Sequence, residues 1–188
     1  MVVYGTRELK RREEIYQLLA LSAQECWGLE CLPQIVRAPG GKPYFPREAE
    51  REFNVSHSGE LGLCALDRRP VGVDIQLVQA RRPGLHARVC SREELEWLER
   101  QPDRWVGFTL LWAMKESRAK YSGEGLTRPI RSIQVPLLQK GERGAVRDGL
   151  LFQTYQGEGW AAAVCGETPA PEQICWRKLG KTEILREE

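Results

Sequence analysis

The spacing of apolar and polar positions predicts long helices that alternate with groups of short strands. Over residues 105–120, apolar side chains recur at steps of three and four, which is typical of a helix with one face against a core. Residues 8–27 show a second stripe of this kind, and Gly28 marks its end. Ser91 and Glu94 form the capping-box pattern that opens a further helix.

Short apolar runs bounded by turn residues predict strands in both halves of the chain. In the first half, runs at 53–57, 61–66 and 71–75 predict an antiparallel meander, and 2–4 predicts a shorter strand. Residues 76–89 are polar and arginine-rich and predict a long loop. In the second half the strand pattern returns, at 133–138, 150–155, 160–165 and 173–179.

Each half therefore contains a long helix and three or four strands, a repeat that favours two similar lobes. We place them at residues 1–76 and 77–188. The 188 residues, 41% hydrophobic and 29% charged, are typical of a soluble globular chain. The net charge of +2 gives no reason to expect nucleic acid as a partner. We expect a cytoplasmic protein with reduced thiols, because the sequence shows no signal peptide, membrane span or zinc-type cysteine spacing.

Two pairs of polar side chains are candidates for chemistry. Asp74 and Gln76 share one face of the predicted strand at 71–75, and oxygen ligands placed like this suit a hard cation such as Mg²⁺. An edge strand with one wet face explains the same pattern. Glu116 and Lys120 lie one turn apart on the predicted helix, directly above Trp112. A solvated ion pair is the alternative there.

Three further residues could bind phosphate. Ser56 and His57 end a predicted strand, where neighbours point to opposite faces, and no GxSxG elbow supports a hydrolase triad. His57 is more economical as a phosphate donor, with a structural histidine as the alternative. Lys42 stands between glycine and proline in a rigid loop, where it could also be a solvated tip. The sequence contains neither a P-loop nor a dinucleotide GxGxxG.

Taken together, these motifs resemble those of 4′-phosphopantetheinyl transferases. VGVDIQ, followed some forty residues later by WAMKESRAKYSGEGL, resembles the two-part signature of that family. GGKPYF and FNVSHSG resemble two further motifs of its surfactin-synthetase-activating, two-lobed branch. The resemblance implies an α+β fold of two pseudo-symmetric lobes, each a long helix on a mainly antiparallel sheet, with the active site in the cleft between them. It also implies transfer of phosphopantetheine from coenzyme A to a carrier-protein serine, with release of 3′,5′-ADP.

The resemblance assigns roles to the residues of the two signature motifs. Asp74 and Glu116 would hold Mg²⁺, or Mn²⁺, with Gln76 standing where many members have a third carboxylate. Lys120 would neutralise charge on the phosphates. The catalytic set is then Asp74, Glu116 and Lys120, with Glu116 or a metal-bound water as the base.

Coenzyme A would also contact residues outside these motifs. Ser56 and His57 would bind phosphate, and Lys42 would reach the nucleotide. Arg11 and Arg12 are weak substitutes for basic residues that larger members carry nearer the N-terminus.

The expected partner is an acyl or peptidyl carrier protein, whose acidic helix would dock on arginines of the predicted loop at Arg81, Arg82, Arg88 and Arg92. The protein is expected to be a monomer that binds neither nucleic acid nor membrane. Two alternatives remain: a coenzyme A-binding relative without transfer activity, and another phosphate-handling enzyme on the same scaffold.

Overall fold

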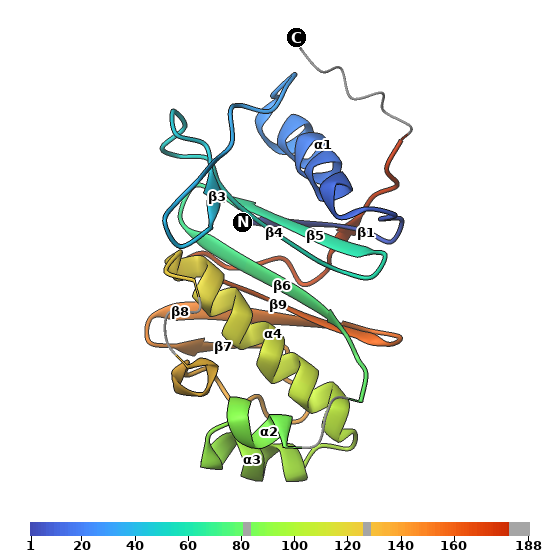
Figure 1. Cartoon of the computed structure of the whole chain (residues 1–188), viewed down its shortest axis with the longest axis vertical. Helices are drawn as coiled ribbons and strands as arrows, with labels where there is room; N and C mark the ends of the chain where they lie inside the picture. The colour runs from blue at the N-terminus through green and yellow to red at the C-terminus, as the bar shows by residue number, and fades with distance from the viewer. Residues whose placement is uncertain (81–83, 126–128, 181–188) are drawn as a thin grey trace.

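The computed structural model describes residues 1–80, 84–125 and 129–180 as two four-stranded sheets, a small hairpin and several helices (Figure 1). The first sheet contains β1 (Val2–Thr6), β4 (Glu52–Ser58), β5 (Leu61–Asp67) and β10 (Cys175–Trp176), in the order β10-β1-β5-β4. The second contains β6 (Val71–Leu77), β7 (Gly144–Arg147), β8 (Leu150–Gly157) and β9 (Trp160–Gly166), in the order β6-β9-β8-β7. The hairpin pairs β2 (Val36–Arg37) with β3 (Pro43–Tyr44). The helices are α1 (Ile15–Trp27), α2 (Leu85–Val89), α3 (Arg92–Glu99) and α4 (Arg104–Ser122), with 3-10 turns at Arg12–Glu14 and Ile130–Ser132.

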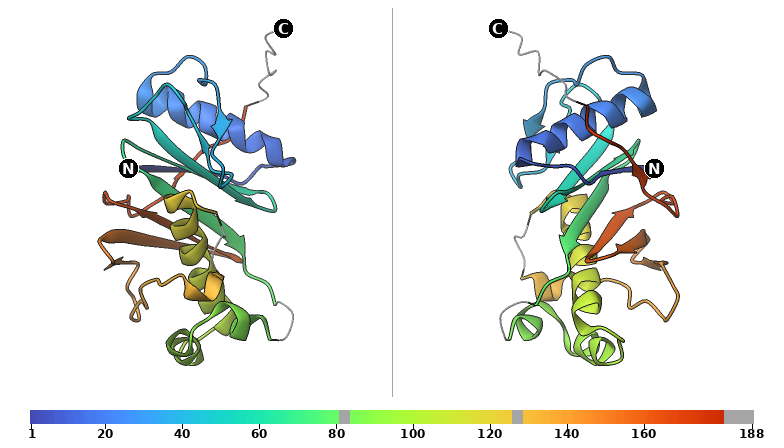
Figure 2. Two further views of the ribbon diagram at one scale, coloured as in Figure 1. Left: turned by 60° about the vertical axis from the view of Figure 1, so that its left-hand side comes forward. Right: turned by 90° about the vertical axis from the view of Figure 1, so that its right-hand side faces the viewer.

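These elements form four layers, because three apolar clusters separate them in succession (Figure 2). One cluster lies between α1 and the first sheet, and another between the second sheet and the α3–α4 pair. The third is shared by the two sheets and includes Leu63 of β5 with Val73 and Ile75 of β6. Strand alternation then turns Asp74 away from that shared core, toward α4. The predicted α+β class with antiparallel sheets is confirmed.

The central helix forms as predicted, and its two ends show why. The Asp103 side chain accepts hydrogen bonds from the backbone N–H groups of Trp105 and Val106, at 2.8 and 3.1 Å, which caps the first turn. Gly123 ends the helix in the left-handed region, at φ 72°. The Ser91–Glu94 capping box is also present at the start of α3. Among the described residues, no helix combines the length and hydropathy needed to cross a membrane.

The first predicted helix starts too early. Residues 8–11 are not helical, and α1 begins only at Ile15 after a 3-10 turn. The cause is local, because the Glu14 carboxylate accepts hydrogen bonds from the backbone of Lys10 and Arg11, at 2.7 and 3.3 Å. Leu9 N also donates to Glu60 O at 3.0 Å, which ties this stretch to the β4–β5 turn. These contacts place the chain outside a helical path.

The predicted meander is only half right. β4 and β5 pair antiparallel as expected, but β6 pairs with β9 and joins the other sheet. β1 takes the place beside β5. The parallel pairing of β10 with β1 likewise carries the C-terminal segment into the first sheet. The sheets thus exchange strands across the predicted boundary after residue 76. That boundary and the pseudo-symmetry of the lobes stay predictions.

The strand predicted at 133–138 is wrong. This segment is extended, but side chains take the carbonyl groups that a neighbouring strand would otherwise bind. Lys115 Nζ donates to Ile133 O at 2.6 Å, Arg118 donates to Gln134 O, and Trp97 Nε1 donates to Leu138 O at 2.8 Å. The apolar spacing that suggested a strand instead buries side chains against α3 and α4.

The sequence interpretation also missed short elements. The β2–β3 hairpin and β7 were not predicted, and α2 lies inside the segment taken as a loop. Each has five residues or fewer, too short to show a clear period.

The two sheets meet along β4 and β6 through side chains instead of a backbone ladder. Alternate residues of β4 face the free edge of β6, and their oxygen atoms accept its backbone N–H groups. The three bonds are Val73 N to Asn54 Oδ1 at 3.0 Å, Ile75 N to Ser56 Oγ at 3.3 Å, and Leu77 N to Ser58 Oγ at 3.1 Å. We call this set the β4–β6 side-chain ladder. It holds the polar face of β6 beside the end of β4.

Candidate functional site

A cavity of about 740 Å³ brings the predicted site residues together. Its walls come from α1 and the hairpin on one side and from β4, β6 and α4 on the other. Of the nine residues predicted from the sequence, eight line it: Arg12, Lys42, Ser56, His57, Asp74, Gln76, Glu116 and Lys120. Only Arg11 does not. Its side chain is 80% exposed and pairs with Glu14 at 3.5 Å on the outer surface.

Asp74 is the centre of the polar contacts in this cavity. It is 2% exposed, and one carboxylate oxygen accepts hydrogen bonds from Lys120 Nζ at 2.6 Å and Ser56 Oγ at 2.7 Å. Gln76 Nε2 donates to the other oxygen at 2.9 Å. A buried carboxylate remains charged only when it is paired and hydrogen-bonded in this way. The two residues predicted to share a strand face therefore do meet.

Ser56 and Lys120 are engaged with each other as well as with the carboxylate. Lys120 Nζ donates to Ser56 Oγ at 3.0 Å and to Val73 O at 3.1 Å. The Ser56 hydroxyl uses its proton on Asp74 and its lone pairs on Lys120 and Ile75 N. A hydroxyl has one proton and two lone pairs, so these bonds use its full capacity. The contact of Ser56 with phosphate stays a prediction. In this structure the Ser56 hydroxyl holds Asp74 in place.

Glu116 has a different environment from Asp74. It is half-buried, and within the described part of the chain no hydrogen bond or ion pair reaches its carboxylate. Burial raises the pKa of Glu116, and the nearby charge of Asp74 raises it further, against the opposing effect of Lys120. The pKa of Glu116 is therefore closer to neutral pH than that of an ordinary glutamate.

A glycine in β6 allows α4 to come this close. A Cβ atom on Gly72 would lie 1.9 Å from Ser117 O, so the backbones of strand and helix are in direct contact there. Gly72 lies two residues before Asp74, and Ser117 directly follows Glu116. The contact thus brings the carboxylates to one wall of the cavity.

The donor set fits a hard divalent cation. Two carboxylates that repel each other, one of them without a partner, gain from a shared positive charge. Gln76 contributes an amide in place of a third carboxylate, and the described residues hold no cluster of three or more histidine, cysteine or acidic side chains. Asp74, Glu116 and Gln76 are thus the residues that could hold Mg²⁺.

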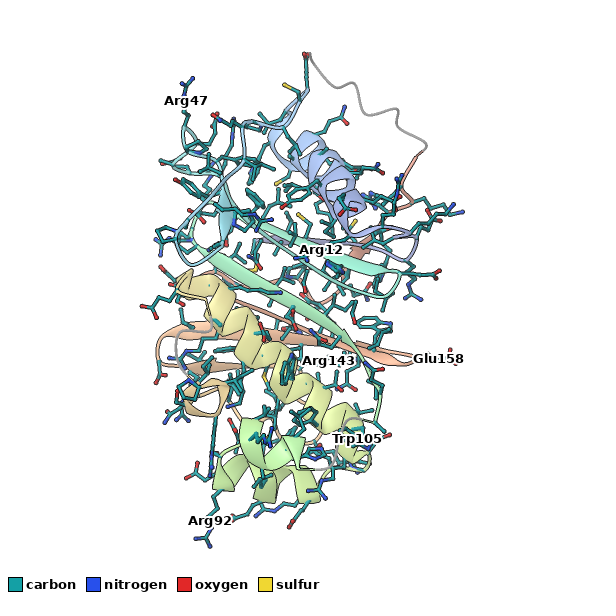
Figure 3. All side chains as sticks on the ribbon, in the orientation of Figure 1. Arg12, Arg47, Arg92, Trp105, Arg143 and Glu158 are labelled. Carbon is teal, nitrogen blue, oxygen red and sulfur yellow. The ribbon has the colours of Figure 1, made fainter. Side chains whose placement is uncertain are left out.

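Basic side chains from the turn before α1, the hairpin and β4 also line the cavity. Burial lowers the pKa of His57, and the charges of Arg12 and Lys120 lower it further, so the imidazole is neutral at physiological pH. Figure 3 labels Arg12 between α1 and α4. Lys42 is mostly buried, and its Nζ donates to Tyr121 O at 3.2 Å and pairs with Glu52 at 3.7 Å. An anionic ligand would find positive charge there.

The sequence did not point to several other residues that line the cavity, among them Tyr16, Arg37, Asn54 and Trp112. Arg37 connects the hairpin to α1, because its guanidinium donates to Gly41 O at 3.0 Å and to Tyr16 Oη at 3.2 Å. Asn54 had a usable signal, since it lies two residues before Ser56 and therefore on the same strand face. Trp112 was noted only as the residue below Glu116.

The arginines predicted to meet a carrier protein are only partly described. Arg81 and Arg82 lie outside the described residues. Arg88 and Arg92 are exposed on α2 and α3, and Arg92 pairs with Glu96 at 3.1 Å. Figure 3 shows Arg92 at the end of the molecule remote from Arg12. Their docking role stays a prediction.

Comparison of the sequence with known proteins shows the family to which the chain belongs. The model of the 4′-phosphopantetheinyl transferase superfamily matches residues 70–165, just over half of the chain. The chain belongs to this superfamily. The match includes β6 and α4, the two elements that carry Asp74, Glu116 and Lys120, so the transferase motifs and the carboxylate wall of the cavity coincide.

Individual relatives carry the same name. A 4′-phosphopantetheinyl transferase from Bacillus subtilis is 36% identical over 136 residues, covering 69% of this chain and 61% of the relative. The transferase Sfp from B. subtilis strain 168 is 35% identical over 142 residues, covering 71% and 63%. A putative 4′-phosphopantetheinyl transferase from Haemophilus influenzae is 31% identical over 154 residues, covering 78% and 60%. The matched part of the chain thus spans about three fifths of the length of these relatives.

Proposed function

We propose that this chain transfers 4′-phosphopantetheine from coenzyme A to a serine of an apo carrier protein and releases 3′,5′-ADP. The observation that carries the proposal is the convergence of eight predicted site residues on one cavity, in a chain of the phosphopantetheinyl transferase superfamily. The cavity lies between the two helix-and-sheet units, which we take as the two lobes, and it separates a carboxylate wall from a basic wall. That division of charge suits a pyrophosphate donor held by a cation on one side and by basic groups on the other.

Asp74, Glu116 and Gln76 would hold Mg²⁺, or Mn²⁺, and this ion would neutralise charge on the pyrophosphate. Lys120 would neutralise charge on the phosphates, and Ser56 and Asp74 keep its ammonium group in position. Either Glu116, whose raised pKa suits a base, or a water beside it would accept the proton of the carrier serine. Most of the rate enhancement would come from alignment and charge, as in other phosphoryl transfers.

The basic wall receives the nucleotide. Arg12 supplies positive charge, Lys42 holds the turn of the hairpin beside the nucleotide, and neutral His57 supplies a hydrogen-bond donor for phosphate. An acyl or peptidyl carrier protein would approach from outside with its acidic helix and present its serine to Glu116. We also expect a cytoplasmic monomer that needs no membrane or nucleic acid.

The test is transfer itself. The purified chain, an apo carrier protein, coenzyme A and Mg²⁺ should give a carrier whose mass has increased by one phosphopantetheine. Asp74→Asn and Glu116→Gln should each reduce transfer by at least about a hundredfold, since each removes a charge from the reacting centre. Glu158→Gln, at an exposed turn between β8 and β9, is the control and should match the unmodified chain.

Two results would redirect the proposal. Binding of coenzyme A without transfer to any apo carrier would favour the coenzyme A-binding relative. Near-normal transfer by either carboxylate variant at saturating Mg²⁺ would remove that residue from the site.

A further inference from the structure

The turn of the β2–β3 hairpin rests on the C-terminal end of α4. A Cβ atom on Gly40 would lie 1.9 Å from Gly123 O and 2.9 Å from the carbonyl carbon of Glu124. A Cβ atom on Gly125 would lie 2.9 Å from Gly40 O. Figure 1 shows the chain before β3 reaching this end of the helix. Backbone therefore packs on backbone here, with no room for a side chain between the two segments.

Close contact, and not turn geometry, requires glycine at position 40. The neighbouring Gly41 has φ 86°, a conformation that favours glycine, yet a Cβ atom there would meet nothing within 4 Å. Gly40 is not among the positive-φ residues, and a Cβ atom there would overlap the helix end. The two adjacent glycines thus serve different purposes, and only Gly40 depends on α4.

Lys42 strengthens the same contact. Its Nζ donates to Tyr121 O, one of the last carbonyls of α4, at 3.2 Å, and its side chain is 12% exposed. A cation at a helix C-terminus interacts favourably with the helix dipole. Glu52 of β4 lies 3.7 Å from the ammonium on the other side. The lysine therefore connects the hairpin, the first sheet and the helix end.

The hairpin is also attached to α1, so it forms a wall of the cavity that joins two elements. Arg37 joins Gly41 O to Tyr16 of α1, and Lys42 joins α4. Arg37, Gly40, Gly41, Lys42, Gly123 and Gly125 all line the cavity. Any shift of the turn against α4 would change the width of its basic end.

We propose that Gly40 and Lys42 are positioning residues that lock the hairpin turn onto the end of α4 and so set the shape of the nucleotide end of the cavity. The identity of the ligand, coenzyme A, rests on the proposed function. The lock should govern affinity for the donor, because it involves only the C-terminal end of α4, whereas Asp74 lies on β6 and Glu116 lies earlier on α4. The described arginines expected to meet the carrier lie on α2 and α3. Donor binding and carrier binding should therefore respond differently when the lock is broken.

Hydrogen–deuterium exchange of the free protein tests the lock without any ligand. Gly40→Ala should increase exchange of the amides at 38–42 and 119–123, and Lys42→Met should do so to a smaller extent. Gly5→Ala is the matched control, because its Cβ would meet Ile174 at 2.7 Å in the first sheet, outside the cavity. Unchanged exchange in both test variants would overturn the lock, whatever the protein binds.

Calorimetry with coenzyme A and 3′,5′-ADP tests the consequence for binding. Gly40→Ala should weaken both ligands by the same factor, about tenfold or more, because they share the nucleotide. The KM for carrier protein and kcat at saturating coenzyme A should stay unchanged. Lys42→Met should act in the same direction, and it remains informative if Gly40→Ala does not fold.

The outcomes separate the lock from the proposed activity. Weaker nucleotide binding in Gly40→Ala, together with no transfer by the unmodified chain, would support the lock and refute the transferase proposal. Weakening by Lys42→Met alone would mean that the lysine contacts the ligand directly, which overturns a positioning role. An equal loss in Gly5→Ala would reduce the effect to general destabilisation and would also overturn it.

Discussion

Replacing Ser56 by alanine should destabilise the folded chain by about 2–4 kcal/mol, although it removes a single oxygen atom. That oxygen donates to Asp74 at 2.7 Å and accepts hydrogen bonds from Lys120 at 3.0 Å and from Ile75 N at 3.3 Å. Ser56 is 6% exposed, so water cannot easily replace these partners. The substitution therefore affects two charged groups and one backbone donor.

The magnitude follows from these three bonds. A hydrogen bond to a charged group contributes about 1.5–3 kcal/mol, and leaving a buried donor unpaired costs about 1–3 kcal/mol. The full sum is not expected, because Lys120 and Asp74 remain 2.6 Å apart and continue to compensate each other. The loss of the direct bond to Asp74 and the partial loss at Ile75 together give the stated range.

Urea unfolding of matched variants measures this loss in the free energy of unfolding. Ser58 is the control, because it occupies the next position of the β4–β6 side-chain ladder and, among the described residues, its Oγ accepts a hydrogen bond only from Leu77 N, at 3.1 Å. Ser58→Ala should cost about 0.5–1.5 kcal/mol, with the same dependence of the free energy of unfolding on urea. If Ser56→Ala were no more destabilising than Ser58→Ala, Ser56 would not anchor Asp74. Loss of coenzyme A affinity alone would then favour the phosphate-binding role that the sequence suggested.

Three other substitutions test separate features. Because folding raises the pKa of Glu116, protonation of this side chain stabilises the folded chain fully below the unfolded pKa, and this stability is lost as pH rises through the folded pKa. Thermal unfolding of Glu116→Gln at several pH values should lack this decline. Parallel pH profiles for the variant and the unmodified chain would contradict the raised pKa. The buried carboxylate of Glu94 lies 2.8 Å from Lys115 Nζ, and Lys115→Met would leave it without this ion pair. The free energy of unfolding in urea should fall by about 3–5 kcal/mol, and a loss below about 1 kcal/mol would show that the pair is dispensable. Gln76→Glu should tighten Mg²⁺ binding in calorimetry without coenzyme A, since it adds a carboxylate to the set; tight binding to the unmodified chain would show that the amide is no handicap.

The sequence predicts the elements better than it predicts their partners. The pattern of α4 is clear because apolar side chains recur at helical steps, and the strands from 53 to 75 can be located because turn residues separate their apolar runs. Periodicity says nothing, however, about which edge a strand joins. β6 pairs with β9, about ninety residues later in the chain, and only the three-dimensional packing selects that partner.

The segment at 133–138 fails for a related reason. Its apolar residues have strand spacing because they are buried, but hydrogen-bond partners decide whether a strand forms. Lys115 and Arg118 take its carbonyl groups from the side of α4. Both residues are charged, and the sequence pattern would place them on a solvent face. A buried lysine that binds backbone carbonyls leaves no periodic signal.

For the candidate site too, the sequence identifies the residues but does not show which of them contact one another. Motifs selected the correct residues for the cavity, because Asp74, Glu116 and Lys120 occupy spacings that an alternating strand and a 3.6-residue helix impose. They could not show that Ser56 holds Asp74 or that Lys42 binds the end of α4. Those contacts join segments 18 and 79 residues apart, and only packing brings them together.

The position of the carboxylates depends on the core that the two sheets share. Val73 and Ile75 enter that core, while the intervening Asp74 faces α4. Shifting β6 by one residue against its neighbours would move every side chain to the opposite face and bury Asp74 among apolar residues. The β4–β6 side-chain ladder opposes such a shift, because its three acceptors face alternate N–H groups of β6, and a one-residue shift would turn those groups away from them. The same two strands thus bring the sheets together and fix where the charge of the site lies.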